Sequence, residues 1–202
     1  MRLVILGGPG AGKGTQSQKL CQQQSIPLVS TGDILREAIA SQSDLGLQVQ
    51  PYVEKGELVP DTLLIEFMRE RLLQSDTARG WLLEGYPRTA FQAEELDFLL
   101  EKLQQKLDWA IYLEVSESVM SDRCIGKLSN LGSKVSQADS RPDNHPEIVQ
   151  RRIDLFHERT VPILEYYGYR YRLLTINGNQ SPEEVNQEIL EKIGNGEGRI
   201  KN

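Results

Sequence analysis

The sequence predicts an α/β fold in which a parallel sheet is covered by helices on both faces. Short apolar runs alternate along the chain with stretches of helical periodicity, a pattern typical of parallel sheets whose strands are joined by helices. A glycine-rich loop at residues 7–15 separates the first apolar run from the first helical stretch. At 202 residues the chain is long enough for one such domain, with room for an inserted subdomain.

Five short apolar runs are expected to form the strands of this sheet. Each run is bounded by turn residues or by a helical stretch, as strands in alternating α/β folds usually are. The helical pattern after the first run extends from Lys13 to about Gln24. The expected strands are residues 2–6, 27–29, 81–84, 110–114 and 172–176.

The second and third strands are separated by more helix than one crossover needs. Residues 33–41, 45–55 and 61–73 are each expected to be helical. One helix is enough to connect two parallel strands. The excess therefore predicts a small helical subdomain, from about Ser30 to Val59, that projects from the core.

A second excess lies between the fourth and fifth strands. Residues 116–124 are expected to be helical, whereas residues 126–141 are polar and show no clear period. An irregular stretch of this length is usually a functional lid or disorder. A long helix should follow, with Asn144 as N-cap, Pro146 in its first turn and Glu147 as capping-box partner. Its core-facing stripe is expected to be Val149, Ile153, Phe156, Ile163 and Tyr167.

The loop Gly7-Gly8-Pro9-Gly10-Ala11-Gly12-Lys13-Gly14-Thr15 predicts a phosphate-binding site. Glycines let the backbone wrap closely around an anion, the helix N-terminus supplies N–H groups, and Lys13 adds a positive charge. The position after the lysine, where a Ser or Thr hydroxyl usually binds Mg²⁺, is occupied by Gly14. A bound metal is therefore expected to be held by phosphate oxygens and waters. The sequence predicts binding of a nucleoside triphosphate or a similar molecule.

Composition excludes several other classes of function. The net charge is −6 and the isoelectric point is near 5.1, which argues against a nucleic-acid-binding protein. No run approaches the ~20 apolar residues of a membrane span, and the first apolar run is too short for a signal peptide. Cys21 and Cys124 are far apart in the sequence, so we expect no zinc site and a reducing compartment. A cytoplasmic protein that binds neither membranes nor nucleic acids is expected.

Two further polar segments follow expected strands. Ser30-Thr31-Gly32-Asp33 comes after the second strand, and Glu84-Gly85-Tyr86-Pro87-Arg88-Thr89 ends the third. Taken alone, the first is compatible with ordinary helix capping and the second with a turn. The carboxyl ends of parallel strands meet at one edge of a sheet, where ligands bind. Both segments are therefore expected to share one crevice with the glycine-rich loop.

Taken together, these motifs resemble those of an adenylate kinase. The resemblance covers nearly the whole chain, in the short-lid form that lacks an inserted zinc-binding segment. It also includes Gly56-Glu57-Leu58-Val59-Pro60-Asp61, Gln92, Asp122-Arg123, Thr160-x-Pro162 and Tyr166-Tyr167. It implies a three-layer α/β/α P-loop fold with a five-stranded parallel sheet. The implied divisions are a core (1–29, 60–125 and 146–194), a nucleoside monophosphate-binding insertion (30–59), a short lid (126–145) and a flexible tail (195–202).

The implied reaction is the reversible transfer of the terminal phosphoryl group of MgATP to AMP, which gives two ADP. ATP, AMP and ADP are the implied small-molecule partners, and Mg²⁺ the implied cofactor. The catalytic residues implied are Lys13, Arg88, Arg123, Arg141 and Arg152. ATP is expected to contact Gly10, Ala11, Gly12, Lys13, Gly14, Thr15, Arg123, Lys127 and Gln180. AMP is expected to contact Thr31, Arg36, Glu57, Leu58, Val59, Gly85, Tyr86, Pro87, Arg88, Gln92, Arg141 and Arg152.

The sequence departs from the family pattern at three positions. Glu84 stands where the family usually has Asp, at the strand end that orients Mg²⁺-bound water together with Asp33. One extra methylene moves this charge, so weaker positioning of Mg²⁺ or a lower rate is expected. Lys127 replaces a phosphate-binding arginine and lacks its bidentate fork. Asn144 replaces the second of two paired acids and leaves Asp143 alone.

Two alternative functions remain open from the sequence. One is a pyrimidine nucleotide (UMP or CMP) kinase of the same superfamily, although Thr31, Thr89 and Gln92 favour adenine. The other is a nucleotide-binding regulator with reduced turnover, for which Glu84 and Lys127 give some support. The absence of an evident exposed apolar stripe leads us to expect a monomer.

Overall fold

The computed structural model describes residues 1–130 and 145–195 and contains a five-stranded sheet with parallel strand pairings throughout. The strands lie in the order β2-β3-β1-β4-β5, so the first strand is central. The predicted parallel α/β fold is confirmed. The strands are β1 (Arg2–Leu6), β2 (Leu28–Ser30), β3 (Trp81–Glu84), β4 (Trp109–Glu114) and β5 (Leu173–Asn177).

All five predicted strands are present, and no strand end is displaced by more than one residue. The displacement of β2 has a clear reason. Pro27 has no N–H to donate to a neighbouring strand, so the strand begins at Leu28. The Pro27 carbonyl still accepts a hydrogen bond from the Leu82 N–H at 3.0 Å.

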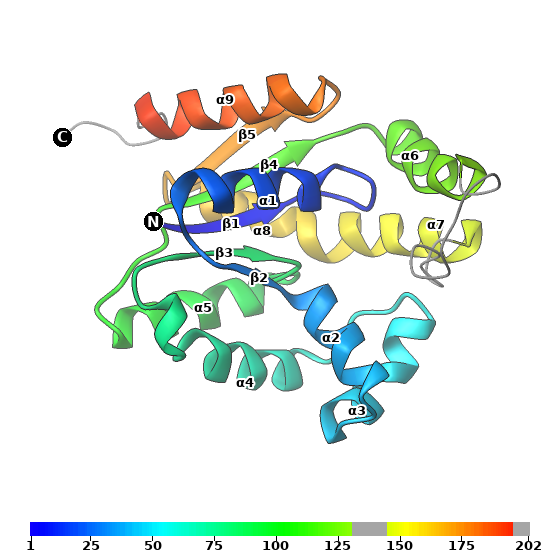
Figure 1. Ribbon diagram of the computed structural model, residues 1–202, viewed down its shortest axis with the longest axis horizontal. Helices are drawn as coiled ribbons and strands as arrows, with labels where there is room; N and C mark the ends of the chain where they lie inside the picture. The colour runs from blue at the N-terminus through cyan, green and yellow to red at the C-terminus, as the bar shows by residue number, and fades with distance from the viewer. Residues whose placement is uncertain (131–144, 196–202) are drawn as a thin grey trace.

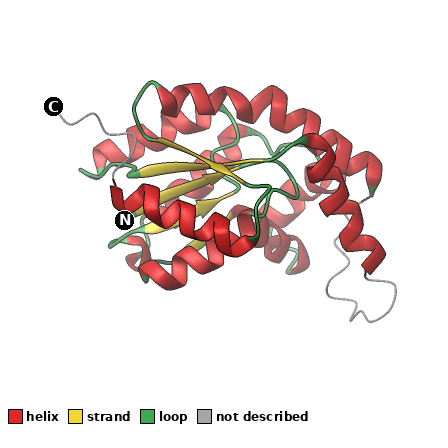
Figure 2. Ribbon diagram, turned by 90° about the horizontal axis from the view of Figure 1, so that it is seen from above, coloured by secondary structure: helices red, strands yellow, loops and turns green. Residues whose placement is uncertain are grey.

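Helices cover both faces of the sheet (Figure 2). Side chains alternate along β1, so Leu3 and Ile5 pack with α1 and α9, whereas Val4 and Leu6 pack with α4, α5 and α8. Each face therefore has its own apolar core, as a three-layer fold requires. The covering helices are α1 (Lys13–Gln24), α9 (Pro182–Asn195), α4 (Asp61–Leu72), α5 (Ala90–Lys102) and α8 (Val161–Gly168). A short 3₁₀ turn, η1 (Ser75–Thr77), precedes β3.

Helices α2 (Thr31–Ala40) and α3 (Asp44–Glu54) lie at one end of the molecule, away from the helices that cover the sheet (Figure 1). The side chains of Ser30 and Ser43 accept hydrogen bonds from the first turns of α2 and α3 and so fix where these helices begin. A Cβ at Gly46 would lie 2.0 Å from the Ala38 carbonyl oxygen, so only glycine permits this close approach of the two helices. The helical connection predicted between β2 and β3 is thus present.

The helix after β4 is longer than predicted. Helix α6 (Glu117–Asn130) continues past Cys124, so the expectation of irregular chain from Gly126 onward is wrong for residues 126–130. A glycine inside a helix costs only about 1 kcal/mol relative to alanine and does not by itself end one. No proline interrupts these residues.

The beginning of helix α7 (Pro146–Leu155) also differs from the prediction. Its N-cap is His145, not Asn144, and the His145 side chain makes no capping hydrogen bond, so the capping box predicted with Glu147 is wrong. Pro146 is the physical reason. A residue before proline is disfavoured in the helical region, so His145 stays extended and the helix starts at the proline itself. Asn144 lies outside the described residues.

Helix α7 continues through a π-helical segment, η3 (Phe156–Thr160), into α8. The apolar stripe predicted along it is confirmed, because Val149, Ile153, Phe156, Ile163 and Tyr167 are all buried. Within residues 1–130 and 145–195, no helix has both the length and the apolar character needed to cross a membrane.

Candidate active site

The glycine-rich loop lies at the carboxyl end of β1 and leads into α1. Gly12 is the N-cap of α1, with φ of 94°, and Gly10 has φ of 74°. A Cβ on Gly10 would also lie 2.6 Å from the Met120 carbonyl oxygen. Both the backbone conformation and the close packing on α6 therefore require glycine at this position.

Lys13 folds back over this loop. Its Nζ donates hydrogen bonds to the carbonyl oxygens of Gly7 and Gly8, at 2.8 and 2.7 Å. Burial, followed by the nearby Arg88 guanidinium, lowers the pKa of Lys13 to about 7, although Glu84 acts in the opposite direction. An anion bound beside this ammonium would raise its pKa again, so the loop is suited to a phosphate.

The three segments predicted to share a crevice do so. The glycine-rich loop, the start of α2 and the end of β3 surround one polar cavity of about 370 Å³, which we call the central chamber. It has cationic and anionic side chains in its wall. The charged residues that line it are Lys13, Asp33, Arg36, Glu84, Arg88 and Arg152.

Three arginines of the central chamber come from three different elements. Arg36 lies on α2 and is ion-paired with Asp33 one turn before it. Arg88 follows β3, and its Nε donates to the Gly85 carbonyl oxygen at 2.9 Å. Arg152 extends from α7. Residues distant in the sequence thus bring three guanidinium groups to one place, where they can bind phosphate oxygens in a bidentate manner.

Thr160 is a supporting residue to which the sequence analysis gave no individual role. It is 7 % exposed and ends the π-helical segment, and its Oγ1 donates to the Arg88 carbonyl oxygen at 3.0 Å. A π-helical turn inside an α-helix shifts the side chains after it and is common at functional sites. In the sequence, only the motif Thr160-x-Pro162 pointed to this residue, and the motif did not indicate Arg88 as its hydrogen-bond partner.

A second cavity lies beside the helices α2 and α3, and we call it the insertion-side cavity. It has a volume of about 90 Å³ and shares Arg36, Arg88 and Arg152 with the central chamber. Most residues predicted to contact AMP line it. They are Thr31, Arg36, Glu57, Leu58, Val59, Gly85, Arg88, Gln92 and Arg152.

Tyr86 and Pro87 are placed differently from the other predicted AMP contacts. Tyr86 is 2 % exposed and is not among the residues that line this cavity; its hydroxyl donates to the backbone carbonyl of Gln92 at 3.2 Å. Burial, with the nearby Glu95 and Asp61, raises its pKa well above the ordinary value. Pro87, joined to Tyr86 by a cis peptide bond, lines a neighbouring small cavity against Phe156. Tyr86 therefore supports the segment from its buried side, and its predicted contact with AMP stays a prediction.

A third cavity of about 540 Å³ lies on the other side of the glycine-rich loop, next to α9, and we call it the α9-side cavity. Arg123 and Gln180, both predicted to contact ATP, line it. Arg123 donates to the Gly178 carbonyl oxygen at 3.0 Å, and Gln180 donates to Glu188 at 2.6 Å. The loop residues Gly10, Ala11, Gly12 and Thr15 complete the wall toward the central chamber.

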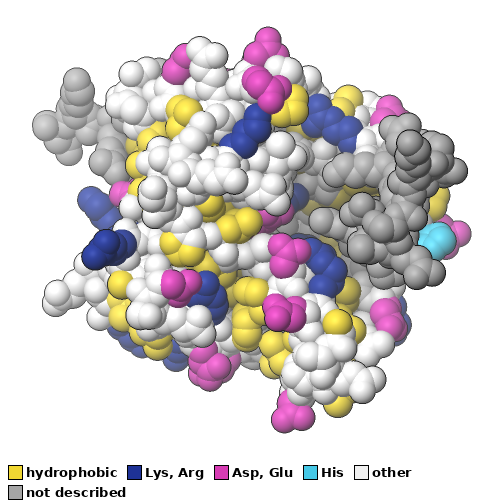
Figure 3. All heavy atoms as spheres, in the orientation of Figure 1, with side chains coloured by type: hydrophobic (Ala, Val, Ile, Leu, Met, Phe, Trp, Pro, Cys, Tyr) yellow, Lys and Arg dark blue, Asp and Glu magenta, His cyan; other side chains and the backbone are white. Residues whose placement is uncertain are grey.

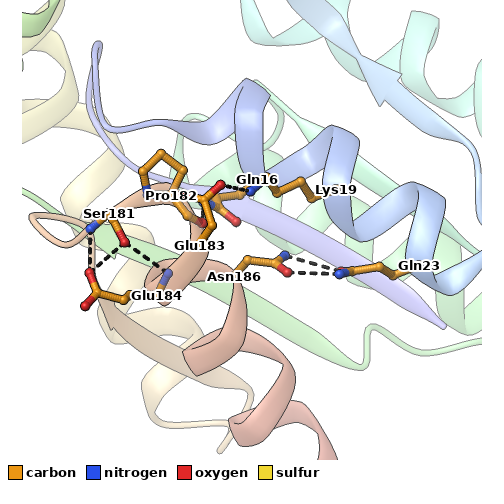
Figure 4. A network of polar contacts seen from close by, with 8 residues as sticks. All are labelled: Gln16, Lys19, Gln23, Ser181, Pro182, Glu183, Glu184 and Asn186. Atoms are coloured by element: carbon orange, nitrogen blue, oxygen red, sulfur yellow. Dashed lines mark hydrogen bonds and ion pairs between the residues drawn. The ribbon is translucent and has the colours of Figure 1, made fainter.

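Side chains of α1 connect this helix to α9 (Figure 4). Gln16, which is 2 % exposed, donates from Nε2 to the Pro182 carbonyl oxygen at 2.9 Å. Further along, Gln23 and Asn186 exchange hydrogen bonds, and Lys19 pairs with Glu183. Nothing in the sequence indicated this role for Gln16, because a glutamine in a helix does not indicate a contact with the first residue of another helix so far away in the chain.

Two carboxylates of the central chamber fit a hydrated Mg²⁺. The Glu84 oxygens lie 3.7 and 3.8 Å from where a Cβ of Gly14 would be, so the carboxylate reaches over the loop beside Lys13. Asp33 lines the same chamber. Carboxylate oxygens that orient metal-bound waters suit a hard cation of this kind. Among the described residues, no three His, Cys, Asp or Glu side chains gather as a dedicated metal site.

Several predicted lid contacts lie where the structure gives no side chain. The backbone of Lys127 is part of α6, but its side chain is outside the described residues, as are Arg141 and Asp143. Over the face seen in Figure 3, acidic and basic side chains are interspersed among the described residues instead of forming a broad basic surface.

Comparison with known proteins decides the family. A model of the family described as adenylate kinase matches residues 5–171. The chain belongs to the adenylate kinase family. It is 62 % identical over 193 residues to adenylate kinase 2 of Nostoc sp., which covers 96 % of this chain and 98 % of the relative.

Other relatives agree. Identity is 51 % over 193 residues to adenylate kinase 2 of Synechocystis sp., covering 96 % of this chain and 100 % of the relative. The identity to an adenylate kinase of Cyanothece sp. is 43 % over 188 residues, and the match covers 93 % of this chain and 92 % of the relative. The family, the P-loop fold and the phosphotransferase class predicted from the motifs are thus confirmed, and the pyrimidine-kinase alternative is not favoured.

Proposed function

We propose that this adenylate kinase transfers the terminal phosphoryl group of MgATP reversibly to AMP, giving two ADP, with the residues named above. The observation that carries the proposal is the central chamber, which joins the insertion-side cavity to the glycine-rich loop and contains Lys13 and three arginines. Two nucleotides placed on either side of it would point their phosphates at one another across these cations.

ATP would occupy the loop and the α9-side cavity. The N–H groups of the loop and of the α1 N-terminus would hold its phosphates. The Lys13 ammonium would exchange the Gly7 and Gly8 carbonyl oxygens for phosphate oxygens. Arg123 and Gln180 would border the adenine, and Lys127 is predicted to bind phosphate from the adjacent helix.

AMP would occupy the insertion-side cavity. Arg36 and Arg88 would bind its phosphate, with Arg152 reaching in from α7. Thr31, the 57–59 segment and Gln92 would hold the adenosine. Arg141 is predicted to join the phosphate cluster from the lid. Residues 30–59 and 126–145 would act as the AMP-side insertion and the lid.

The chemistry demands positioning and charge neutralisation more than covalent catalysis. Charge spreads over the oxygens of the transferred group in the transition state, so fixed cations lower the barrier. No side chain has to act as a general base, because the acceptor is already an anionic phosphate oxygen. Mg²⁺, when bound with ATP, supplies further neutralisation through waters oriented by Glu84 and Asp33. Enclosure of the chamber would exclude water, which otherwise competes with AMP as acceptor.

A coupled assay for ADP formation from MgATP tests the proposal, with AMP, CMP, UMP and GMP as acceptors. AMP is expected to be the preferred acceptor, and turnover should require Mg²⁺. Preference for CMP or UMP would support the pyrimidine-kinase alternative. Nucleotide binding without turnover would support the regulator.

Monomeric state and cytoplasmic location are part of the same proposal. Cys21 is half-buried and Cys124 buried, and both are free thiols, which agrees with a reducing compartment. Light scattering coupled to size-exclusion chromatography should give the mass of one chain. A dimer mass at assay concentrations would contradict the monomer.

A further inference from the structure

A carboxylate outside the proposed contact set holds the amide of Gln92. Asp61, the first residue of α4, accepts a hydrogen bond at Oδ1 from Gln92 Nε2 at 2.7 Å. Its Oδ2 accepts from the hydroxyl of Thr89 at 3.1 Å. Thr89 is the N-cap of α5, and its Oγ1 in turn accepts from the Gln92 N–H. Asp61 thus contacts Gln92 directly and also through the cap of the helix that carries it.

The other end of the amide is held as well. Gln92 Oε1 accepts a hydrogen bond from the backbone N–H of Arg88 at 2.7 Å. A carboxylate can only accept and a backbone N–H can only donate, so these two partners fix which end of the amide is oxygen and which is nitrogen. Gln92 is 1 % exposed, so water is poorly placed to replace either partner in a reversed orientation.

The fixed amide still has capacity for a ligand. An amide carries two N–H donors and two lone pairs on its oxygen, and Asp61 and Arg88 use one of each. Gln92 lines the insertion-side cavity, so the second donor and the second lone pair are the groups it can offer there. Their order along the cavity wall is set by the same two partners.

We infer that Asp61 is a positioning residue that sets base specificity, by locking the Gln92 amide in the orientation that suits a 6-aminopurine. Adenine presents a donor at its 6-amino group next to an acceptor at N1. A 6-oxopurine presents an acceptor at position 6 and a donor at N1, so both hydrogen bonds would require a reversed amide. Reversal would turn the amide oxygen toward the Asp61 carboxylate, which repels it, and the amide nitrogen toward a backbone N–H.

The inference rests on the proposed binding of AMP in the insertion-side cavity and deepens it. Gln92 would contact the base, whereas Asp61 acts through Gln92. Asp61 should therefore affect the choice between bases and the affinity for AMP, and leave the binding of ATP unchanged.

The test compares AMP with IMP, which differs from AMP in carrying a 6-oxo group and a proton on N1. In Asp61→Asn the new amide can donate as well as accept, so it tolerates either orientation of Gln92. The ratio of kcat/KM for AMP to kcat/KM for IMP should fall about tenfold, since one of two polar restraints is lost. The KM for AMP should rise, while the KM for ATP stays within about twofold of the wild-type value.

Asp97→Asn is the matched control. Asp97 is also a partly buried aspartate that accepts hydrogen bonds, from Tyr166 and Arg172, and it lies on the same helix as Gln92. Its replacement should change the melting temperature but not the AMP-to-IMP ratio. If Asp61→Asn does not fold, Asp61→Ala replaces it, and the same AMP-to-IMP ratio is measured.

The outcomes separate the inference from the proposed function. Failure of the wild-type enzyme to phosphorylate AMP would contradict the proposed function itself. An AMP-to-IMP ratio that stays within about twofold of wild type in Asp61→Asn, in an enzyme that uses AMP, would overturn the inference alone. An equal fall of the ratio in Asp97→Asn would also overturn it, because the effect would then be one of general stability.

Discussion

The α9-side and insertion-side cavities differ in how their polar groups are held. In the α9-side cavity, Arg123 and Gln180 are partly exposed, and they donate hydrogen bonds to the Gly178 carbonyl oxygen and the Glu188 carboxylate, respectively. In the insertion-side cavity, Gln92 is buried and fixed at both ends of its amide. A partly exposed side chain can turn to suit a different base, whereas a buried one that is held at both ends of its amide cannot. The insertion-side cavity should therefore be the more selective of the two.

The largest loss of activity is expected from a change in the central chamber, next to the insertion-side cavity. Arg88→Met removes a guanidinium shared by the central chamber and the insertion-side cavity. Because this charge would stabilise the phosphoryl group in transit, kcat/KM for AMP should fall about 10⁴-fold. Steady-state kinetics give the value. Arg71→Met, which breaks only the surface pair with Asp76, is the control and should stay near wild type. A loss below about tenfold in Arg88→Met would place the transferred group elsewhere.

Exchanging the base of the acceptor and of the donor nucleotide measures how far the two cavities differ in selectivity. Exchanging AMP for IMP as acceptor should lower kcat/KM about 10³-fold, because buried polar groups would be left unpaired. Exchanging ATP for ITP as donor should cost less than about tenfold, because exposed side chains can adjust. Both values come from one ADP-formation assay with wild-type enzyme. Equal losses on the two sides would remove the distinction drawn between the cavities.

On the side of the loop, ATP binding should take up a proton near neutral pH. The pKa of Lys13 is about 7 in the protein, so above that pH its amino group is neutral in most molecules. Bound phosphates would raise this pKa. The affinity for ATP should accordingly fall as pH rises above 7, by about tenfold per pH unit at most. Calorimetry in buffers of different ionisation enthalpy should show the uptake in wild type. Lys13→Met should lack it, and equal uptake in both proteins would exclude Lys13 as its source.

The lowered pKa of Lys13 also makes the free energy of unfolding depend on pH. An unfolded chain keeps this lysine protonated up to the ordinary lysine pKa of 10.5, so between about pH 7 and 10.5 the unfolded chain binds one more proton than the folded protein. The contribution of Lys13 to the free energy of unfolding should therefore rise with pH across this window. Urea titrations of wild type and Lys13→Met at several pH values would show the two curves converging toward high pH. Curves that stay parallel would contradict the lowered pKa.

The smallest effect is expected at the metal-facing carboxylate. Glu84→Asp shortens the side chain that reaches over Gly14 and should raise kcat a few-fold by improving the position of Mg²⁺-bound water. The KM for Mg²⁺, measured at fixed ATP, should fall in parallel. Glu114→Asp, at the exposed end of strand β4, which β1 separates from β3, is the control. An unchanged kcat in Glu84→Asp would show that the longer side chain is already well placed.

Much of the fold could be predicted from local pattern, and the errors have local causes. Strand β1 and helix α1 occupy the residues expected, because a buried apolar run before a glycine-rich turn is a strong signal. The predicted end of α6 and the predicted N-cap of α7 were wrong. Residues 126–130 are mostly polar but helical, and Pro146 keeps His145 out of the helical region, so Asn144 cannot be the N-cap.

The candidate site divides in the same way. Lys13, Arg36 and Arg88 could be named from motifs, and the structure places them around one chamber. Their roles remain predictions, as do those of Lys127, Arg141 and the domain boundaries. The support given to Arg88 by Thr160, and to Gln92 by Asp61, could not have been predicted. A threonine or an aspartate at a helix end is ordinarily a cap, and nothing in the sequence indicates a partner on another element.

The sequence by itself determined the parallel sheet, the phosphate-binding loop and the set of cations near it. These features follow from periodicity, from glycines that only a close backbone approach requires, and from strand ends that a parallel sheet must bring together. The tertiary structure alone decided which hydrogen-bonding groups are buried and which partner fixes each of them. That information depends on contacts between α4, α5 and α8, whose distances in space are not encoded in any local pattern.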